Sequence, residues 1–330
     1  MALLTARDHY KPFEYPWAYE FYKRMQQLHW LPEEAPLQED IRDWVTKLTP
    51  AERNLLTQLF RFFTQADADI AAGYGDEYIP NFRHPELRMM FFAFGAAEAN
   101  HMDAYSQLLD TIGMPESEYK AFQSYKVMKD KHDYMFLKGD TNLSAEERMA
   151  LKLAVFSAFG EGMQLFSSFA MLMSFKQRNL MKGMSTIIEW SIRDESLHVE
   201  GMIKLFHTLI KENPKLWTDR LKAAIYQTCR DMVELEDSFI NLAFEMGDIA
   251  GITAAETKNY IRYIADRRLL QLGLKANYGV KDNPFDWLDW MMNAHTHTNF
   301  FEGRSTEYTK GGVSDWQSAW VWLDKHPSKN

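Results

Sequence analysis

Apolar residues along most of this chain recur at the spacing of an α-helix, and polar motifs mark where individual helices begin. The segment Thr49–Glu52 is a capping box with proline at the first helical position, and it predicts a helix that ends near Gly73 or Gly75. Ser144–Glu147 and Thr253–Glu256 are two further capping boxes. No segment alternates apolar and polar residues between turn signals, so we expect no sheet.

Two longer helices are bounded by proline and glycine. One opens at His84-Pro85 and runs to Gly113, and the other runs from Met184 to Glu212 and stops before Pro214. The helix that follows Ser144 contains a long apolar run, which is typical of a helix buried on all sides. The pattern therefore predicts an all-α bundle of long, packed helices.

One short motif occurs in both long helices, as Glu98-Ala-Asn-His101 and as Glu195-Ser-Leu-His198. Residues three apart lie on one face of a helix, so each copy presents a carboxylate beside an imidazole. Two further helices each carry one carboxylate in apolar surroundings. Two Glu-x-x-His helices and two helices with one carboxylate each are the ligand set of a carboxylate-bridged dinuclear metal site in a ferritin-like bundle. The candidate ligands are Asp67, Glu98, His101, Glu161, Glu195 and His198.

The apolar neighbours of these carboxylates favour a metal over a solvated surface. The residues just before Glu98 read Phe-Phe-Ala-Phe-Gly-Ala-Ala. A lone buried carboxylate is costly unless it is protonated, paired or metal-bound, and we expect no matching set of buried lysines or arginines in these helices. Four carboxylates balance two divalent ions, and oxygen-rich ligation with two imidazoles suits iron or manganese.

Tyr105 lies one turn after His101 and two turns after Glu98, so we expect it on the same helix face, beside the metals. A tyrosine in that position is within reach of one-electron oxidation by a high-valent metal centre. The alternative is a packed tyrosine that donates a hydrogen bond to a ligand.

Composition, charge and cysteine content indicate what class of protein this is, which partners are disfavoured and which compartment suits it. The chain has 330 residues, of which 46% are hydrophobic and 25% charged, as in a globular protein. Its net charge of −9 argues against nucleic acid or an anionic membrane surface as a partner. The single cysteine, Cys229, allows no intrachain disulfide and indicates a reducing, cytoplasmic setting. Residues Leu153 to Phe175 are long enough to span a membrane, but Glu161 in their middle favours a buried bundle helix.

The C-terminal segment differs from the rest of the chain. Gly303 to Asp315 is rich in Gly, Ser and Thr, and three tryptophans follow between Trp316 and Trp322. We therefore expect a helical domain over residues 1–302 and a flexible tail over residues 303–330. The aromatic end of the tail is typical of a partner-docking peptide, with folding back onto its own bundle as the alternative.

In the order and spacing of the six candidate ligands and Tyr105, this chain resembles the small, radical-generating subunit of class I ribonucleotide reductase. The resemblance covers roughly residues 10 to 300. The resemblance implies that Asp67, Glu98 and His101 bind one metal and that Glu161, Glu195 and His198 bind the other. It implies two iron ions first, with two manganese ions or a manganese–iron pair as alternatives. Tyr105 matches the radical tyrosine of the family.

The resemblance also implies a path for the oxidising equivalent. Trp30, in His-Trp-Leu-Pro-Glu-Glu, matches the tryptophan of the radical-transfer chain, and Asp194 matches the aspartate that links this tryptophan to His101. Tyr308 is the candidate for the mobile tyrosine that hands the radical on. The reduced dimetal site would react with oxygen or a reduced oxygen species. The hole would then move to a cysteine of a separate large subunit, which the tail of this homodimeric small subunit would dock.

One departure concerns the pocket of the radical tyrosine, which in the family is apolar. The corresponding positions here are Leu165, Phe169 and Ser191, and Ser191 brings a hydroxyl. We expect that hydroxyl to change the hydrogen bonding and lifetime of a radical on Tyr105, and the oxidant could then reside on the metals.

Two other functions fit part of the pattern. A ferritin-like two-metal oxidase that acts on a bound ligand shares the fold, and a metal-storage bundle shares the Glu-x-x-His pairs. The aromatic tail and the pair of Trp30 and Asp194 favour the reductase.

Overall fold

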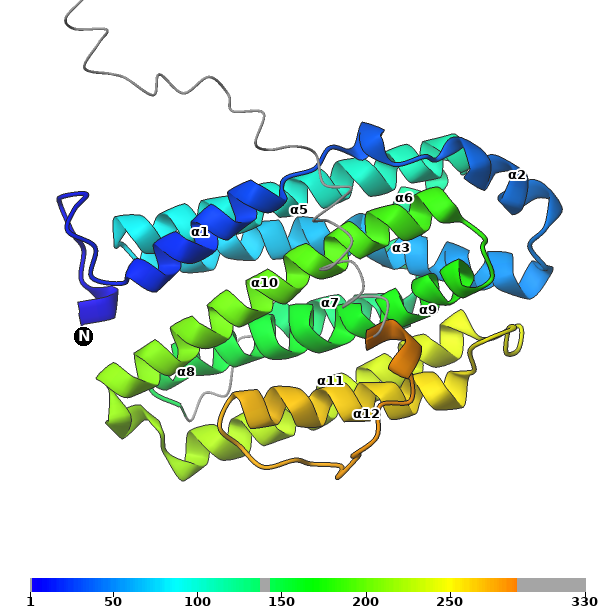
Figure 1. The fold of residues 1–330 in the computed structure, drawn as a ribbon. Helices are drawn as coiled ribbons and strands as arrows, with labels where there is room; N and C mark the ends of the chain where they lie inside the picture. The colour runs from blue at the N-terminus through cyan, green and yellow to red at the C-terminus, as the bar shows by residue number, and fades with distance from the viewer. Residues whose placement is uncertain (1, 137–142, 290–330) are drawn as a thin grey trace, which may run out of the picture. The chain divides into compact units, whose positions relative to one another are not determined.

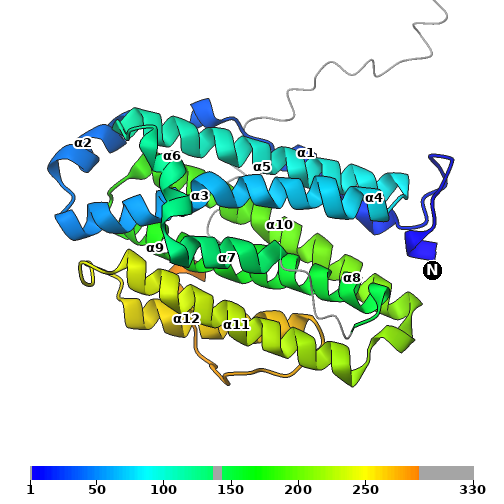
Figure 2. The ribbon, with the colours of Figure 1, turned by 180° about the vertical axis from the view of Figure 1, so that it is seen from behind.

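Helices form nearly all the regular structure of the part of the chain that the computed structural model describes, residues 2–136 and 143–289. The longest are α3, α5, α10 and α11, and Figures 1 and 2 show them running side by side. The helices are α1 Pro16–Leu28, α2 Gln38–Thr46, α3 Pro50–Gly73, α4 Ile79–Asn81, α5 Pro85–Ile112, α6 Ser117–Ala121, α7 Lys126–Phe136, α8 Ala145–Leu153, α9 Leu165–Gln177, α10 Lys182–Glu212, α11 Asp219–Ala243 and α12 Ala254–Gln271.

The predicted all-α, ferritin-like bundle is confirmed. All three predicted capping boxes form, at Thr49, Ser144 and Thr253, each with its glutamate three residues later. Helix α5 ends at Gly113, whose φ of 76° is left-handed and suits glycine. Helix α10 begins at Lys182, two residues before the predicted start. The described residues contain no strand, only an isolated bridge between Ile249 and Ile252.

Two segments depart from regular α-helix in a way the sequence did not predict. The π-helix η3, Tyr74–Tyr78, continues α3, and the π-helix η5, Ala154–Gln164, joins α8 to α9. Glu161 lies within η5. Such π-helical turns re-aim side chains and are frequent at functional sites. At Gly162, a β-carbon would lie 2.8 Å from Nε of Arg268, which explains one glycine beside Glu161.

Helix α10 packs against α5, α9 and η5, and α3 packs against α5. The elements that carry the candidate ligands, α3, α5, η5 and α10, therefore meet in the interior. Their facing surfaces are lined by fully buried side chains such as Phe91, Phe94, Phe159 and Leu205. The core around the candidate ligands is thus dense and apolar.

Chain contacts separate a unit from Met1 to Asp286 from a second unit, Trp287 to Asn330. Every helix above belongs to the first unit. The predicted boundary between residues 302 and 303 lies outside the described residues and stays a prediction. None of the described helices is both long enough and apolar enough to cross a membrane.

Candidate metal centre

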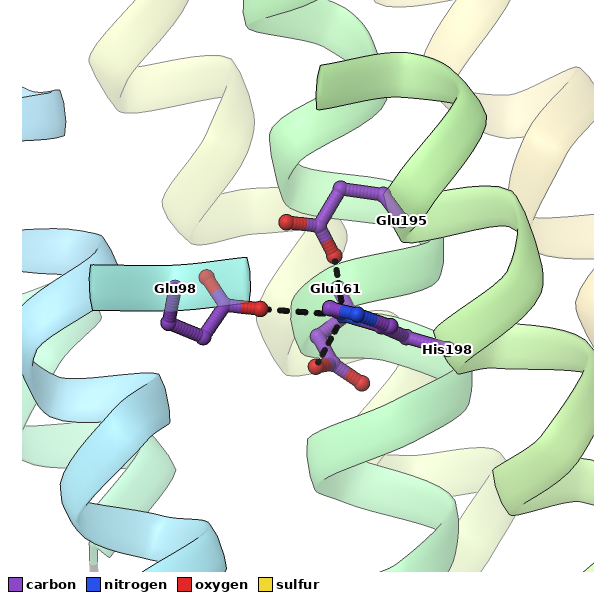
Figure 3. Close-up of side chains that lie close together, drawn as sticks. All are labelled: Glu98, Glu161, Glu195 and His198. Atoms are coloured by element: carbon purple, nitrogen blue, oxygen red, sulfur yellow. Dashed lines mark ion pairs between the residues drawn. The ribbon is translucent and has the colours of Figure 1, made fainter. Parts of the chain in front are cut away.

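The structure brings all six candidate ligands into one buried cluster. Each of them is at most 1% exposed. Figure 3 shows Glu98 reaching from α5 toward His198 and Glu195 of α10, with Glu161 of η5 completing the group. The remaining members, Asp67 and His101, come from α3 and α5.

The ligand atoms form two groups in which every atom lies within 4.8 Å of the others. One group contains Glu98, Glu161, Glu195 and His198, and the other contains Asp67, Glu98 and His101. Glu98 belongs to both. The arrangement therefore offers two adjacent binding positions that share a carboxylate.

Glu98 and Glu195 each lie between the two imidazoles. The two carboxylate oxygens of Glu98 lie 3.4 Å from Nδ1 of His101 and 2.9 Å from Nδ1 of His198. Those of Glu195 lie 3.4 Å and 3.3 Å from the same two nitrogens. Each of these two glutamates therefore turns one oxygen toward each imidazole.

Unsatisfied atoms show that the cluster suits cations. Within the described part of the chain, seven buried atoms of these side chains make no hydrogen bond, including both oxygens of Glu98 and both ring nitrogens of His198. Buried polar groups are normally paired, so a cluster of orphaned oxygens and imidazole nitrogens needs an explanation. Two divalent ions would satisfy these atoms and balance the four carboxylates.

The electrostatics of the cluster lead to the same conclusion. Burial raises the pKa of Glu161 to about 8 and raises that of Asp67 well above its ordinary range. Burial also acts on Glu195, but the charges and hydrogen bonds of His198 and His101 outweigh it and lower this pKa to about 2. Burial opposes protonation of the two imidazoles, yet the surrounding carboxylates raise their pKa values. Without a metal, the cluster therefore retains protons, which bound cations would displace.

Trp30, Asp194 and His101 form a continuous line of contacts from the cluster outward. Nε1 of Trp30 donates a hydrogen bond of 2.8 Å to Oδ2 of Asp194, and the same oxygen lies 3.3 Å from Nε2 of His101. Asp194 therefore fixes the orientation of an imidazole whose other nitrogen faces Glu98 and Glu195.

Tyr105 lies beside the cluster and is only 2% exposed. Its hydroxyl donates a hydrogen bond of 3.2 Å to Oγ of Ser191. The ring centroid of Phe63 lies 4.9 Å from that of Tyr105, and the ring of Phe169 stacks on Phe63 at a centroid distance of 5.6 Å. Leu165 is also buried. The expected contact of Ser191 with Tyr105 is present, and Phe63 is a further ring against this tyrosine.

Two neighbours of the cluster were missed by the sequence analysis. Phe63 lies one turn before Asp67, and Tyr74 lies two turns after it, so helical spacing could have indicated both. The hydroxyl of Tyr74 donates a hydrogen bond of 2.6 Å to Glu161. Tyr308 and the aromatic tail lie outside the described residues.

Comparison with known proteins agrees with this geometry. The sequence pattern of the family described as "Ribonucleotide reductase, small chain" matches residues 7–284. A probable ribonucleoside-diphosphate reductase small subunit of Invertebrate iridescent virus 3 is 45% identical to this chain, over 95% of this chain and 88% of the relative.

Solved structures share the fold. The ribonucleotide reductase R2 subunit from Clostridium botulinum superposes with a TM-score of 0.78 at 24% identity, covering 87% of this chain and 91% of that one. The dimanganese(II)-NrdF of Streptococcus sanguinis superposes with a TM-score of 0.72 at 21% identity, covering 84% and 95%. The family match and the sequence identity show that this chain belongs to the small-chain family of ribonucleotide reductase and has the function of a ribonucleoside-diphosphate reductase small subunit.

Proposed function

We propose that this chain generates and delivers the one-electron oxidant that starts ribonucleotide reduction in the large subunit. The observation that carries the proposal is the placement of two buried glutamates between two imidazoles, joined through Asp194 to a buried tryptophan. The residues that would hold the two metal ions are Asp67, Glu98, His101, Glu161, Glu195 and His198.

When bound, the two ions would supply the redox chemistry that converts oxygen, or a reduced oxygen species, into an oxidant. Two iron ions are our first assignment. Two manganese ions or a manganese–iron pair suit the same donors, and the related protein of Streptococcus sanguinis is described as dimanganese(II). Glu98 and Glu195 would bridge the ions, while the hydroxyl of Tyr74 holds Glu161 in place.

Tyr105 is the proposed store of the oxidising equivalent. It is buried, it lies beside Asp67 and His101, and its hydroxyl has a fixed partner in Ser191. Loss of an electron would be accompanied by loss of its phenolic proton, because burial disfavours an uncompensated charge. Storage on the metals is the alternative.

Trp30 and Asp194 form the proposed exit from the metal centre. Trp30 would pass an electron inward toward His101 while its Nε1 proton shifts along the hydrogen bond to Asp194. Tyr308 would complete the path to the large subunit, with the tail from residue 303 onward as the docking element.

We further propose a cytoplasmic homodimer. Phe92, Ala96 and Ala99 lie on one exposed face of α5, and Phe92 is 59% exposed. A large exposed aromatic ring beside small residues supports a second copy packing against this face. The buried, unpaired Cys229 supports a reducing compartment.

The test combines metal quantification with low-temperature paramagnetic resonance on protein loaded with iron, manganese or both and then exposed to oxygen. We expect about two ions per chain. Glu98→Ala should lose most of this loading, because Glu98 belongs to both groups. The control, Glu86→Gln, alters an equally buried carboxylate outside the cluster and should load normally. Loading near zero in the unmodified protein would refute the metal centre.

Tyr105→Phe separates the two possible stores of the oxidant. This variant should lose any tyrosyl signal while it keeps both metals. If nucleotide reduction with the large subunit survives the change, the oxidant resides on the metals and the role proposed for Tyr105 is wrong.

A further inference from the structure

Trp190 lies directly against Trp30 and extends from it toward the surface. The ring centroids of the two tryptophans are 5.0 Å apart, with their planes inclined by 42°. Trp30 is only 4% exposed, whereas Trp190 is half-buried. Trp190 lies on α10, one turn before Asp194. The two indole rings therefore form a pair that spans from the interior to the solvent-accessible side of α10.

The position of Trp30 within this pair is tightly fixed. Its Nε1 is bound to Asp194, and its carbonyl oxygen accepts a hydrogen bond of 3.0 Å from Asn100. Its ring stacks on His101 at a centroid distance of 5.9 Å. Within the described part of the chain, the rings in contact with Trp30 are thus the buried His101 of the cluster and the half-buried Trp190.

A buried tryptophan cannot by itself contact an electron donor on another polypeptide, and electron transfer slows steeply with distance. We propose that Trp190 is a relay residue that accepts the oxidising equivalent from Trp30 and carries it to the surface. This inference rests on the proposed function, because the metal centre must first oxidise Trp30.

The step balances in electrons and protons. Oxidised Trp30, whose Nε1 proton has moved to Asp194, takes one electron from Trp190 and recovers that proton through the same hydrogen bond. Trp190 becomes the oxidised indole and releases its own Nε1 proton to the water that reaches its half-buried ring. It then recovers an electron and a proton from the next redox-active aromatic residue or thiol of the path.

Four variants test the relay, and one of them, Trp30→Phe, removes the residue that would oxidise Trp190. Trp190→Phe keeps an aromatic ring for packing but cannot be oxidised, while Trp190→Tyr keeps a ring that can. The matched control is Trp217→Phe, since Trp217 is also half-buried but contacts the ring of Phe206 instead. Near-ultraviolet circular dichroism of the metal-free proteins reports on the indole pair, and its exciton signal should disappear in Trp190→Phe and persist in Trp217→Phe.

The decisive measurement follows the stored oxidising equivalent of the loaded protein by paramagnetic resonance while a water-soluble ferrocene reduces it from outside. We expect the decay to slow strongly in Trp190→Phe and in Trp30→Phe, and to keep its original rate in Trp190→Tyr and Trp217→Phe. Nucleotide reduction with the large subunit should divide the variants in the same way, with activity lost in Trp190→Phe and retained in Trp190→Tyr.

The outcomes separate the relay from the function on which it rests. Suppose that in Trp190→Phe the stored oxidising equivalent decays, and nucleotides are reduced, as fast as in the unmodified protein, while both processes are slowed or lost in Trp30→Phe. The relay is then refuted and the proposed function stands. If the unmodified, metal-loaded protein never forms an oxidising equivalent, the proposed function itself fails. Equal loss in Trp190→Phe and Trp190→Tyr would show a packing role and would also overturn the relay.

Discussion

Removal of the Ser191 hydroxyl should destabilise the protein through Tyr105. The phenol of Tyr105 is 2% exposed and donates its hydrogen bond of 3.2 Å to Ser191, which is fully buried. In Ser191→Ala this donor loses its acceptor where water cannot replace it. Leaving one buried polar group unsatisfied costs about 1–3 kcal/mol, so we expect a loss of unfolding free energy in that range.

The assay is denaturant unfolding of the metal-free protein in chelator, at one fixed protein concentration because the unfolding of the proposed homodimer would depend on concentration. Ser168→Ala is the matched control, since the hydroxyl of Ser168 is equally buried but makes no hydrogen bond to any residue that the structure describes. Its removal should change the unfolding free energy little.

A double-mutant cycle isolates the contact itself. In a Tyr105→Phe background the phenol is absent, so Ser191→Ala should then cost no more than Ser168→Ala. We expect a coupling between Tyr105 and Ser191 of about 1 kcal/mol. Coupling indistinguishable from zero would refute the hydrogen bond, and with it the expectation that Ser191 tunes a radical on Tyr105.

Three further predictions address stability, protons and docking. Lys131 and Glu236 form a fully buried ion pair of 2.7 Å, so Lys131→Met should lower the unfolding free energy by about 3–5 kcal/mol in thermal or denaturant unfolding. The control, Lys222→Met, removes one partner of the exposed pair with Asp219 and should lower it by at most about 1 kcal/mol. Equal losses in the two variants would contradict the reasoning. In the metal-free protein the raised pKa of Glu161, about 8, means that the folded state binds a proton that the unfolded chain has released. Stability should therefore fall as pH rises from about 4.5 to 8, by up to about 1.4 kcal/mol per unit for each such proton, and Glu161→Gln should make this slope shallower. Deletion of Trp316 to Asn330 should abolish binding to the large subunit, measured by calorimetry, while metal loading stays normal; unchanged affinity would exclude the tail as the docking element.

Much of the fold and of the cluster was predictable because the controlling signals are local. A capping box needs only residues three apart, and Thr49, Ser144 and Thr253 all begin helices where expected. A Glu-x-x-His pair on one helix fixes a carboxylate beside an imidazole whatever that helix contacts. Helical period also placed Tyr105 on the face of its helix that carries Glu98 and His101.

Other features depend on how closely separate helices approach, which no local pattern encodes. The π-helical form of η5 arises in a segment whose apolar run looks like ordinary buried helix. The contact of Tyr74 with Glu161 and the buried pair of Lys131 with Glu236 join residues far apart in the sequence. Each depends on the packing of the whole core.

The sequence by itself therefore determined the all-α class, the six buried ligand candidates and the chemistry that such donors support, because periodicity and residue type are properties of single helices. Only the tertiary structure decided that Glu98 and Glu195 both lie between His101 and His198, because bridging requires two helices to meet within a few ångströms. It also decided that Trp190 lies against Trp30, since that contact is made by α10 and the segment that follows α1.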